Sequence, residues 1–295
     1  MKIAQYDVDG SPEVGLVGSD GSLLPLDLPA GMSGDAAVLA LASGELAAHV
    51  ADRPRRDMST VTLAAPIRRP STVRDFLLFE EHLANGLRPR GRDVPPAWYR
   101  RPYFYFTNPH TVMGSRSEVV APVPGDLDYE LELAAVVGRR LQDATPEEAA
   151  AAIVGFTFFN DLSLRDRQTD EHPVGLGPSK SKDFASLLGP FLVTPDEVPG
   201  GARRPQLELE ARVNGETWSR GRTSDMYFDL GQAIAHASEN SLVMPGDVVA
   251  TGTLPTGCIL ELRALAGREE RHWLQTGDRV DFVSPTLGCL TTLIT

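Results

Sequence analysis

Short apolar stretches, some alternating with polar residues and others unbroken, follow one another along most of this chain. Stretches of this kind are typical of β-strands. Strands are expected at residues 2–8, 13–17, 23–26, 103–106, 129–137, 153–159 and 258–263. Helical spacing, capping residues and terminal glycines predict helices between residues 35 and 51, 71 and 86, and 227 and 240. The pattern therefore predicts an α+β fold class in which β-structure dominates.

Turn-forming residues divide the chain into two parts. The stretch Arg68-Arg69-Pro70-Ser71 interrupts the hydrophobic pattern with proline and polar residues. We therefore expect a small N-terminal β-rich domain at residues 1–67 and a larger domain at residues 68–295.

Composition changes this picture by excluding several classes of partner. The net charge of −12 argues against binding to nucleic acid or to an anionic membrane surface. The sequence contains neither an apolar run near the ~20 residues of a membrane span nor a recognisable signal peptide. Its two cysteines, Cys258 and Cys289, cannot form a disulfide framework and are expected to be small buried residues. A cytoplasmic protein is expected.

Two acidic residues interrupt an otherwise apolar strand. Glu130 and Glu132 are two residues apart, so their side chains point to the same face of the strand. Like charges in a core need a cation or protons to neutralise them. Asp161 ends the next apolar strand, and Asp75 lies on a third segment. An oxygen-only donor set favours Mg²⁺, with Mn²⁺ or Ca²⁺ as alternatives. The other interpretation places the glutamates on the solvated face of an edge strand.

The expected helix at residues 71–86 carries both Asp75 and His82. Seven residues make nearly two helical turns, so both side chains can face one cavity. The alternative for His82, as for any lone histidine, is a hydrogen-bonded and partly buried residue without a role in chemistry. The following segment, residues 85–102, is rich in arginine, proline and glycine and is expected to be a loop. It is either a lid that gathers an anionic substrate or a solvated basic loop.

A set of motifs in a specific order resembles the fumarylacetoacetate hydrolase family over residues 66–295. These motifs are Asp75-Phe76, Glu81-His82, Tyr129-Glu130-Leu131-Glu132-Leu133-Ala134, Phe159-Asn160-Asp161-Leu162-Ser163-Leu164-Arg165-Asp166, Gly177-Pro178-Ser179-Lys180-Ser181-Lys182-Asp183-Phe184, Pro245-Gly246-Asp247-Val248-Val249-Ala250-Thr251-Gly252-Thr253 and Leu260-Glu261-Leu262. The resemblance implies a mixed β-roll catalytic domain. It also implies that a divalent cation is held by Asp75, Glu130, Glu132 and Asp161.

The resemblance further implies roles for individual side chains. His82 would be the general base and Glu261 the carboxylate that orients it, since Asn85 stands where some relatives carry a closer glutamate. Lys182, rather than Lys180, would offset the surplus acid charge and donate to a developing oxyanion.

Arg165, Gln168 and Thr253 would contact the substrate, with Gly252 and Thr253 forming an oxyanion-hole type turn. Leu77 stands where relatives of the founding hydrolase often have a tyrosine, so one polar substrate contact is expected to be missing.

These roles predict a metal-dependent hydrolase that cleaves a C–C bond in a small anionic substrate, a β-diketo or acylpyruvate-type acid. Water activated by His82 and Glu261 would attack, and the metal would stabilise the resulting enolate. One alternative is a 2-keto acid decarboxylase, hydratase or isomerase on the same metal site. Another is a non-catalytic metal-binding scaffold. A homodimer is expected from the resemblance.

Overall fold

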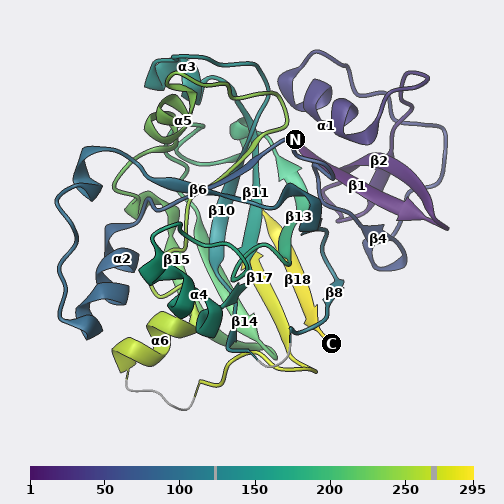
Figure 1. Cartoon of the computed structure of the whole chain (residues 1–295). Coiled ribbons are helices and arrows are strands. Elements are labelled where there is room, and N and C mark those ends of the chain that lie inside the picture. Colours follow the sequence, from purple (N-terminus) through teal and green to yellow (C-terminus); the bar gives the residue numbers. More distant parts are fainter. Residues whose placement is uncertain (123–124, 267–270) are drawn as a thin grey trace.

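Two mixed β-sheets, packed face to face, organise the chain (Figure 1). The computed structural model describes residues 1–122, 125–266 and 271–295. The larger sheet runs in the order β3-β2-β1-β13-β11-β10-β16-β5-β6, with β4 beside β1 and β7 beside β13. The bounds in that order are β3 Leu23–Pro25, β2 Ser11–Val17, β1 Lys2–Val8, β13 Ser186–Val193, β11 Ile153–Asp161, β10 Leu131–Val137, β16 Val248–Ala250, β5 Val73–Phe76, β6 Phe104–Thr107, β4 Thr62–Leu63 and β7 Val112–Met113.

The smaller sheet has the order β15-β14-β17-β18-β8, and a separate pair joins β12 to β9. Their bounds are β15 Glu216–Arg222, β14 Glu208–Val213, β17 Arg279–Ser284, β18 Gly288–Ile294, β8 Ser117–Val119, β12 Ser163–Leu164 and β9 Leu127–Asp128. The α-helices are α1 Gly34–Ser43, α2 Glu80–Leu87, α3 Pro146–Ala150, α4 Arg165–Glu171, α5 Leu230–Ser238 and α6 Ile259–Ala266. This mixture confirms the predicted β-dominated α+β class.

Strand β10 has two apolar faces, and each face packs against a different apolar cluster of the core. Leu131 and Leu133 belong to the core between the sheets, where Phe158 packs against Phe282. Ala134 and Val136 face the second apolar cluster, which includes residues of α1. Residues of the same parity share a face, so Glu130 and Glu132 lie on the side of Ala134 and Val136. This confirms the expected pairing of the two glutamates on a buried segment.

The N-terminal residues extend the larger sheet. Strand β1 pairs antiparallel with β13, where Lys2 lies opposite Val193, and helix α1 contacts β1 and β2. The N-terminal strands and α1 lie together at one side of the molecule in Figure 1. The expected domain boundary at residues 67 and 68 therefore falls between strands that belong to one continuous sheet.

The predicted helix at residues 71–86 is wrong in its N-terminal half. Residues 73–76 form β5, which pairs in parallel with β16 at Val73 and Val248, and only Glu80–Leu87 are helical. A buried ion pair between Arg74 and Asp247 (2.9 Å) ties the two strands together. Pairing with a strand about 175 residues away thus overrides the local helical spacing.

The predicted strand at residues 258–263 is also wrong, because these residues begin α6. The carboxylate of Asp128 accepts hydrogen bonds from the backbone N–H groups of Ile259 (2.7 Å) and Leu260 (3.0 Å). It thereby satisfies N–H groups in the first turn of the helix, as a capping side chain does. Another part of the chain supplies this cap, so the alternating Leu-Glu-Leu pattern was misleading.

The other predictions of secondary structure differ mainly in their ends. Helix α1 stops at Ser43, where Gly44 takes a left-handed conformation, instead of reaching residue 51. Helix α5 lies inside the predicted range 227–240. Cys258 is buried as expected, but Cys289 is exposed. Within the described residues, none of the helices has the length and apolarity needed to cross a bilayer.

Candidate active site

Three buried carboxylates from neighbouring strands form the centre of the site. Asp75 comes from β5, Glu132 from β10 and Glu130 from the residue before β10, and β16 lies between the two strands. One carboxylate oxygen from each of these residues lies within 4.8 Å of the others. The fold therefore gathers three of the four predicted metal ligands at one point.

Asp161, the fourth predicted ligand, lies beside this cluster at the end of β11. Tyr105 on β6 connects it to the cluster, because its hydroxyl bridges the carboxylates of Asp161 and Asp75 (2.6 Å to Asp75). Lys182 donates to Asp161 (2.6 Å) and to Glu130. Asp161 is thus held by protein donors that also contact Asp75 and Glu130.

Tyr105 was not among the residues predicted for the site. It lies in the expected strand at residues 103–106, but nothing in the local pattern distinguishes it from Tyr103. Strand pairing decides the difference: Asp75 lies directly opposite Tyr105 in the antiparallel ladder of β5 and β6. Leu77 and Tyr105 both line the cavity, so Tyr105 supplies a phenol there although Leu77 does not.

The surplus of acidic groups perturbs the site electrostatically. Burial, reinforced by the charge of Asp161, raises the pKa of Asp75 to about 8. Burial and then Asp75 raise the pKa of Glu132 well above its usual value. Burial acts in the same direction on Glu130, but Lys182 and Arg165 lower its pKa below the ordinary range. If all of these acids were ionised, they would carry more negative charge than Lys182 and Arg165 neutralise, so protons or a bound cation must offset the rest.

The donor set fits a hard divalent cation. Asp75 Oδ1 is buried and has no hydrogen-bond partner among the described residues, which is costly unless a ligand satisfies it. Carboxylate oxygens are the ligands that Mg²⁺, Mn²⁺ and Ca²⁺ prefer. Asp75, Glu130 and Glu132 are the residues placed to hold such an ion.

The two predicted cations of the site are both buried. Arg165, the first residue of α4, donates to Asp128 (2.8 Å), Glu130 (2.7 Å) and Gln168 (2.9 Å). Lys182 contacts the acids as described above, whereas Lys180 is exposed and pairs with Asp183 (2.8 Å). Arg165 therefore orients Glu130 and Gln168, and both cations counter the acid charge.

The turn at Gly252 and Thr253 supports Glu132. The backbone N–H of Gly252 donates to one oxygen of Glu132 (3.1 Å), and the Thr253 hydroxyl donates to the other (3.3 Å). These two donors, expected at an oxyanion, are directed at the carboxylate of Glu132, a predicted metal ligand. Thr253 also lines the cavity, so its predicted contact with a substrate stays a prediction.

A histidine–glutamate pair faces the same cavity from the helical side. His82 on α2 and Glu261 on α6 share a hydrogen bond of 2.8 Å between Nδ1 and Oε2. The other oxygen of Glu261 accepts from Asn85 Nδ2 (2.9 Å) and from the backbone N–H of Thr256 (3.2 Å). Burial lowers the pKa of His82, but the carboxylate of Glu261 outweighs it and raises that pKa above the ordinary value. The predicted pairing is present. His82 lies on a helix as predicted, whereas Glu261 lies on a helix instead of the predicted strand.

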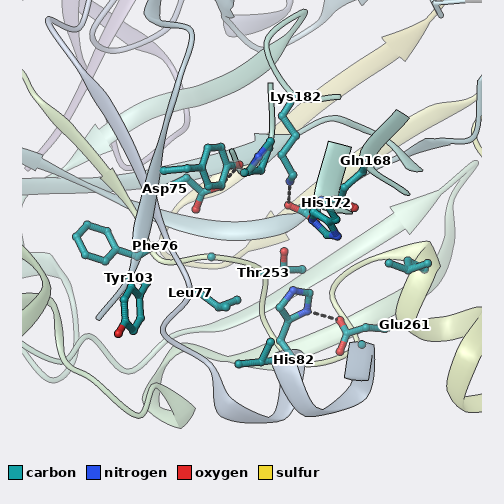
Figure 2. A pocket seen from close by; sticks show the side chains of 18 of the residues that line it. Asp75, Phe76, Leu77, His82, Tyr103, Gln168, His172, Lys182, Thr253 and Glu261 are labelled. Carbon is teal, nitrogen blue, oxygen red and sulfur yellow. Dashed lines mark hydrogen bonds and ion pairs between the residues drawn. The ribbon is translucent and has the colours of Figure 1, made fainter. Parts of the chain in front are cut away.

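One cavity of about 460 Å³ joins the carboxylates to this pair. His82 and Glu261 lie on the side of the cavity opposite Asp75 and Lys182 in Figure 2. The predicted substrate contacts Arg165, Gln168 and Thr253 also line the cavity, and so do Arg90, Arg92 and His172. Of the arginine-rich segment, residues 88–90 and 98–100 form short 3-10 turns. His172 was missed, and no motif in the sequence marked it.

Comparison with known proteins gives a consistent result. The C-terminal domain family of fumarylacetoacetate hydrolase matches residues 71–295. Oxaloacetate tautomerase FAHD2A, mitochondrial, of Homo sapiens is 31% identical over 255 residues, which cover 86% of this chain and 75% of the relative. Oxaloacetate tautomerase YisK of Bacillus subtilis (strain 168) is 31% identical over 241 residues, covering 80% of this chain and 74% of the relative. The solved fumarylacetoacetate hydrolase of psychrophilic Exiguobacterium antarcticum superposes with a TM-score of 0.78 at 26% identity, covering 100% of this chain and 99% of that chain.

Proposed function

The chain belongs to the fumarylacetoacetate hydrolase family, and we propose that this metal-dependent enzyme hydrolyses a C–C bond in a β-diketo or acylpyruvate-type acid. The observation that supports hydrolysis is the 2.8 Å hydrogen bond between His82 and Glu261 at a cavity whose other side carries the buried acids. A base positioned in this way can activate a water molecule beside a bound carbonyl group.

The residues divide the chemistry between the two sides of the cavity. A divalent cation on Asp75, Glu130 and Glu132, most simply Mg²⁺, would supply Lewis-acid polarisation of substrate oxygens. His82 takes a proton from water through Nε2, while Glu261 holds the Nδ1–H and stabilises the imidazolium. The hydroxide oxygen bonds to the carbonyl carbon, the adjacent C–C bond breaks, and His82 returns the proton to the departing carbon. Lys182 keeps the surplus negative charge of Glu130 and Asp161 in balance.

The entrance of the cavity supports an anionic substrate. Arg90 and Arg92 are exposed and line the cavity, and cationic groups at a mouth raise the local concentration of carboxylates. A small keto acid fits this arrangement, with Gln168 and Thr253 as further contacts. The homodimer and the cytoplasmic location stay predictions.

A second candidate function is tautomerisation or isomerisation of a 2-oxo acid. It is favoured by two relatives above 30% identity that are named oxaloacetate tautomerases. The same pair would serve, because His82 can remove a proton from the carbon next to a carbonyl and return a proton elsewhere. Decarboxylation or hydration would use the same bound substrate with a different bond change.

The products distinguish these reactions. We propose incubating the enzyme, loaded with Mg²⁺ or Mn²⁺, with a panel of acylpyruvates, oxaloacetate and fumarylacetoacetate analogues, and identifying products by mass spectrometry. Hydrolysis yields two acids whose masses sum to substrate plus water, whereas tautomerisation leaves the mass unchanged and decarboxylation releases CO₂. His82→Ala should lose the activity, and His110→Ala, which changes an exposed histidine, serves as the matched control. Products with unchanged mass throughout the panel would replace the hydrolase proposal with the isomerase.

A further inference from the structure

Cys258 lies next to the histidine–glutamate pair and has no part in the proposed reaction. Its Sγ donates to Glu261 Oε2 at 3.5 Å, and the same oxygen lies 2.8 Å from His82 Nδ1. One ligand atom each from His82, Cys258 and Glu261 lie within 4.8 Å of one another. We propose that these three residues form a second metal site, selective for Zn²⁺, beside the carboxylate cluster.

The ligand types point to zinc rather than to magnesium. Imidazole nitrogen, thiolate sulfur and carboxylate oxygen are the usual ligands of Zn²⁺, which prefers a tetrahedral arrangement. A hard cation such as Mg²⁺ prefers the oxygen-only set of Asp75, Glu130 and Glu132. The two neighbouring sites therefore differ in the metal that each would select.

Two of the three separations between ligand atoms are close to those that zinc requires. Tetrahedral bonds of about 2.0 Å to N and O and about 2.3 Å to S place the ligand atoms roughly 3.3–3.5 Å apart. The observed separation of Sγ and Oε2 is 3.5 Å, and that of Nδ1 and Oε2 is 2.8 Å, a hydrogen-bond length. Replacing the bridging proton by a metal ion requires the His82 ring to move by about half an ångström.

The surroundings hold the ligands in place and balance the charge. Asn85 and the Thr256 N–H occupy Glu261 Oε1, which leaves Oε2 directed at the other two ligands. The backbone of Cys258 pairs with that of Glu130 in an isolated antiparallel bridge. When Zn²⁺ binds, the Cys258 thiol releases its proton to water, and the thiolate and the Glu261 carboxylate together neutralise the ion. The loaded site therefore carries no net charge in a region where Cys258 is 0% and Glu261 1% exposed.

The site can be reached from the cavity. His82 and Glu261 both line the cavity, and the side chain of His82 is 17% exposed. Three protein ligands leave the fourth tetrahedral position for water or substrate. An ion that enters on this side meets the imidazole before the buried thiol.

Zinc at this position should inhibit the enzyme. It would bind His82 Nδ1 and withdraw Glu261 from the imidazole, so the pair could no longer move a proton. This consequence rests on the proposed function, whereas the binding site itself does not.

Cobalt spectroscopy tests the site without relying on activity. Co²⁺ replaces Zn²⁺ in such sites, and a cysteine ligand gives an intense thiolate-to-cobalt charge-transfer absorption that an oxygen-only site lacks. We expect this absorption in the wild-type protein and in Cys289→Ser, which changes the exposed cysteine, and its loss in Cys258→Ser. Added Zn²⁺ should abolish the band. Absence of the band from the wild type, or its persistence in Cys258→Ser, would overturn the proposal. Cys258→Ala replaces the serine variant if the latter fails to fold.

Inhibition provides the second test. With Mg²⁺ kept at saturation, Zn²⁺ should inhibit the wild type, and inhibition of Cys258→Ser should require at least about tenfold more Zn²⁺. Loss of an outer-sphere partner alone lowers the metal affinity of a site by about tenfold or more, so loss of a direct ligand should cost at least as much. Cys258→Ser should keep its basal activity, because serine can also donate to Glu261. A cobalt band without zinc inhibition would refute the role of His82 as base and leave the site intact. Equal inhibition of both proteins, with no band, would overturn the site and leave the proposed function standing.

Discussion

Replacing Glu261 by glutamine should abolish most of the activity by changing which nitrogen of His82 carries the proton. Glu261 Oε1 accepts hydrogen bonds from two N–H donors, Asn85 Nδ2 at 2.9 Å and Thr256 N at 3.2 Å. A glutamine must keep its oxygen at this position, because an NH₂ group there would face two donors. Its NH₂ group therefore takes the position of Oε2, 2.8 Å from His82 Nδ1.

An NH₂ group facing Nδ1 turns that nitrogen into an acceptor and moves its proton to Nε2. The nitrogen that must take a proton in the cavity then carries one already, although the geometry of the site is almost unchanged. Loss of a general base costs on the order of 10²–10⁴-fold in rate, which corresponds to about 3–5 kcal/mol. The same change of tautomer in a Ser-His-Asp triad costs about 10⁴-fold. We therefore expect Glu261→Gln to lower kcat by roughly 10²–10⁴-fold while metal content stays constant.

The assay is steady-state kinetics on whichever substrate turns over, with metal content and circular dichroism measured in parallel. Glu81→Gln is the matched control, because Glu81 is an exposed residue of the helix that carries His82. The double variant with His82→Ala should be little worse than His82→Ala alone, since residues that act as a unit are not additive. A wild-type rate in Glu261→Gln, or additive losses in the double variant, would refute the proposed pair.

The pH dependence gives an independent check of the same pair. Only the neutral imidazole is a base, so kcat/KM should rise with pH through the ionisation of His82. Glu261 favours the protonated imidazole, and the pKa of His82 is raised above its ordinary value, so this rise should lie above the ordinary pH range for histidine. In Glu261→Gln, the residual rate should still rise with pH, but the midpoint of this rise should shift to a lower pH. A rate that falls as pH increases through this range would contradict the assignment of His82 as the base.

Three further predictions concern the metal and the cations. Chelation should abolish activity, and Mg²⁺ or Mn²⁺ should restore it; full activity of a protein shown by elemental analysis to be metal-free would contradict the requirement for a metal. Glu132→Ala should also reduce the rise in Tm that added metal produces. Neutralising Arg90 and Arg92 should raise KM and weaken the salt dependence of kcat/KM, and unchanged kinetics at low and high salt would leave them as part of a solvated loop. Lys182→Met should destabilise the metal-free protein by about 3–5 kcal/mol in urea unfolding, because it removes the buried cation beside Asp161 and one of the two beside Glu130. Lys180→Met, at an exposed position, is the control, and equal effects of the two would contradict the burial argument.

The pattern within individual strands was enough to predict the most informative feature of the site. Glu130 and Glu132 interrupt an apolar run with a spacing of two, and this spacing has one meaning on a strand: both side chains share a face. Repulsion between the two carboxylates in a buried segment then predicted a neutralising cation, without any knowledge of the fold. The order of the motifs, rather than any single one, distinguished Lys182 from Lys180 and connected His82 to Glu261 across about 180 residues.

Tertiary structure decided what local spacing could not. The segment around Asp75 has helical spacing but forms a strand, because β16 offers a parallel ladder and Asp247 pairs with Arg74. The segment around Glu261 alternates like a strand but forms a helix, because Asp128 caps its first turn. Tyr105 reaches the acids only through its register opposite Asp75. In each case the deciding partner is distant in sequence, so its contribution to the free energy is absent from any short window of residues.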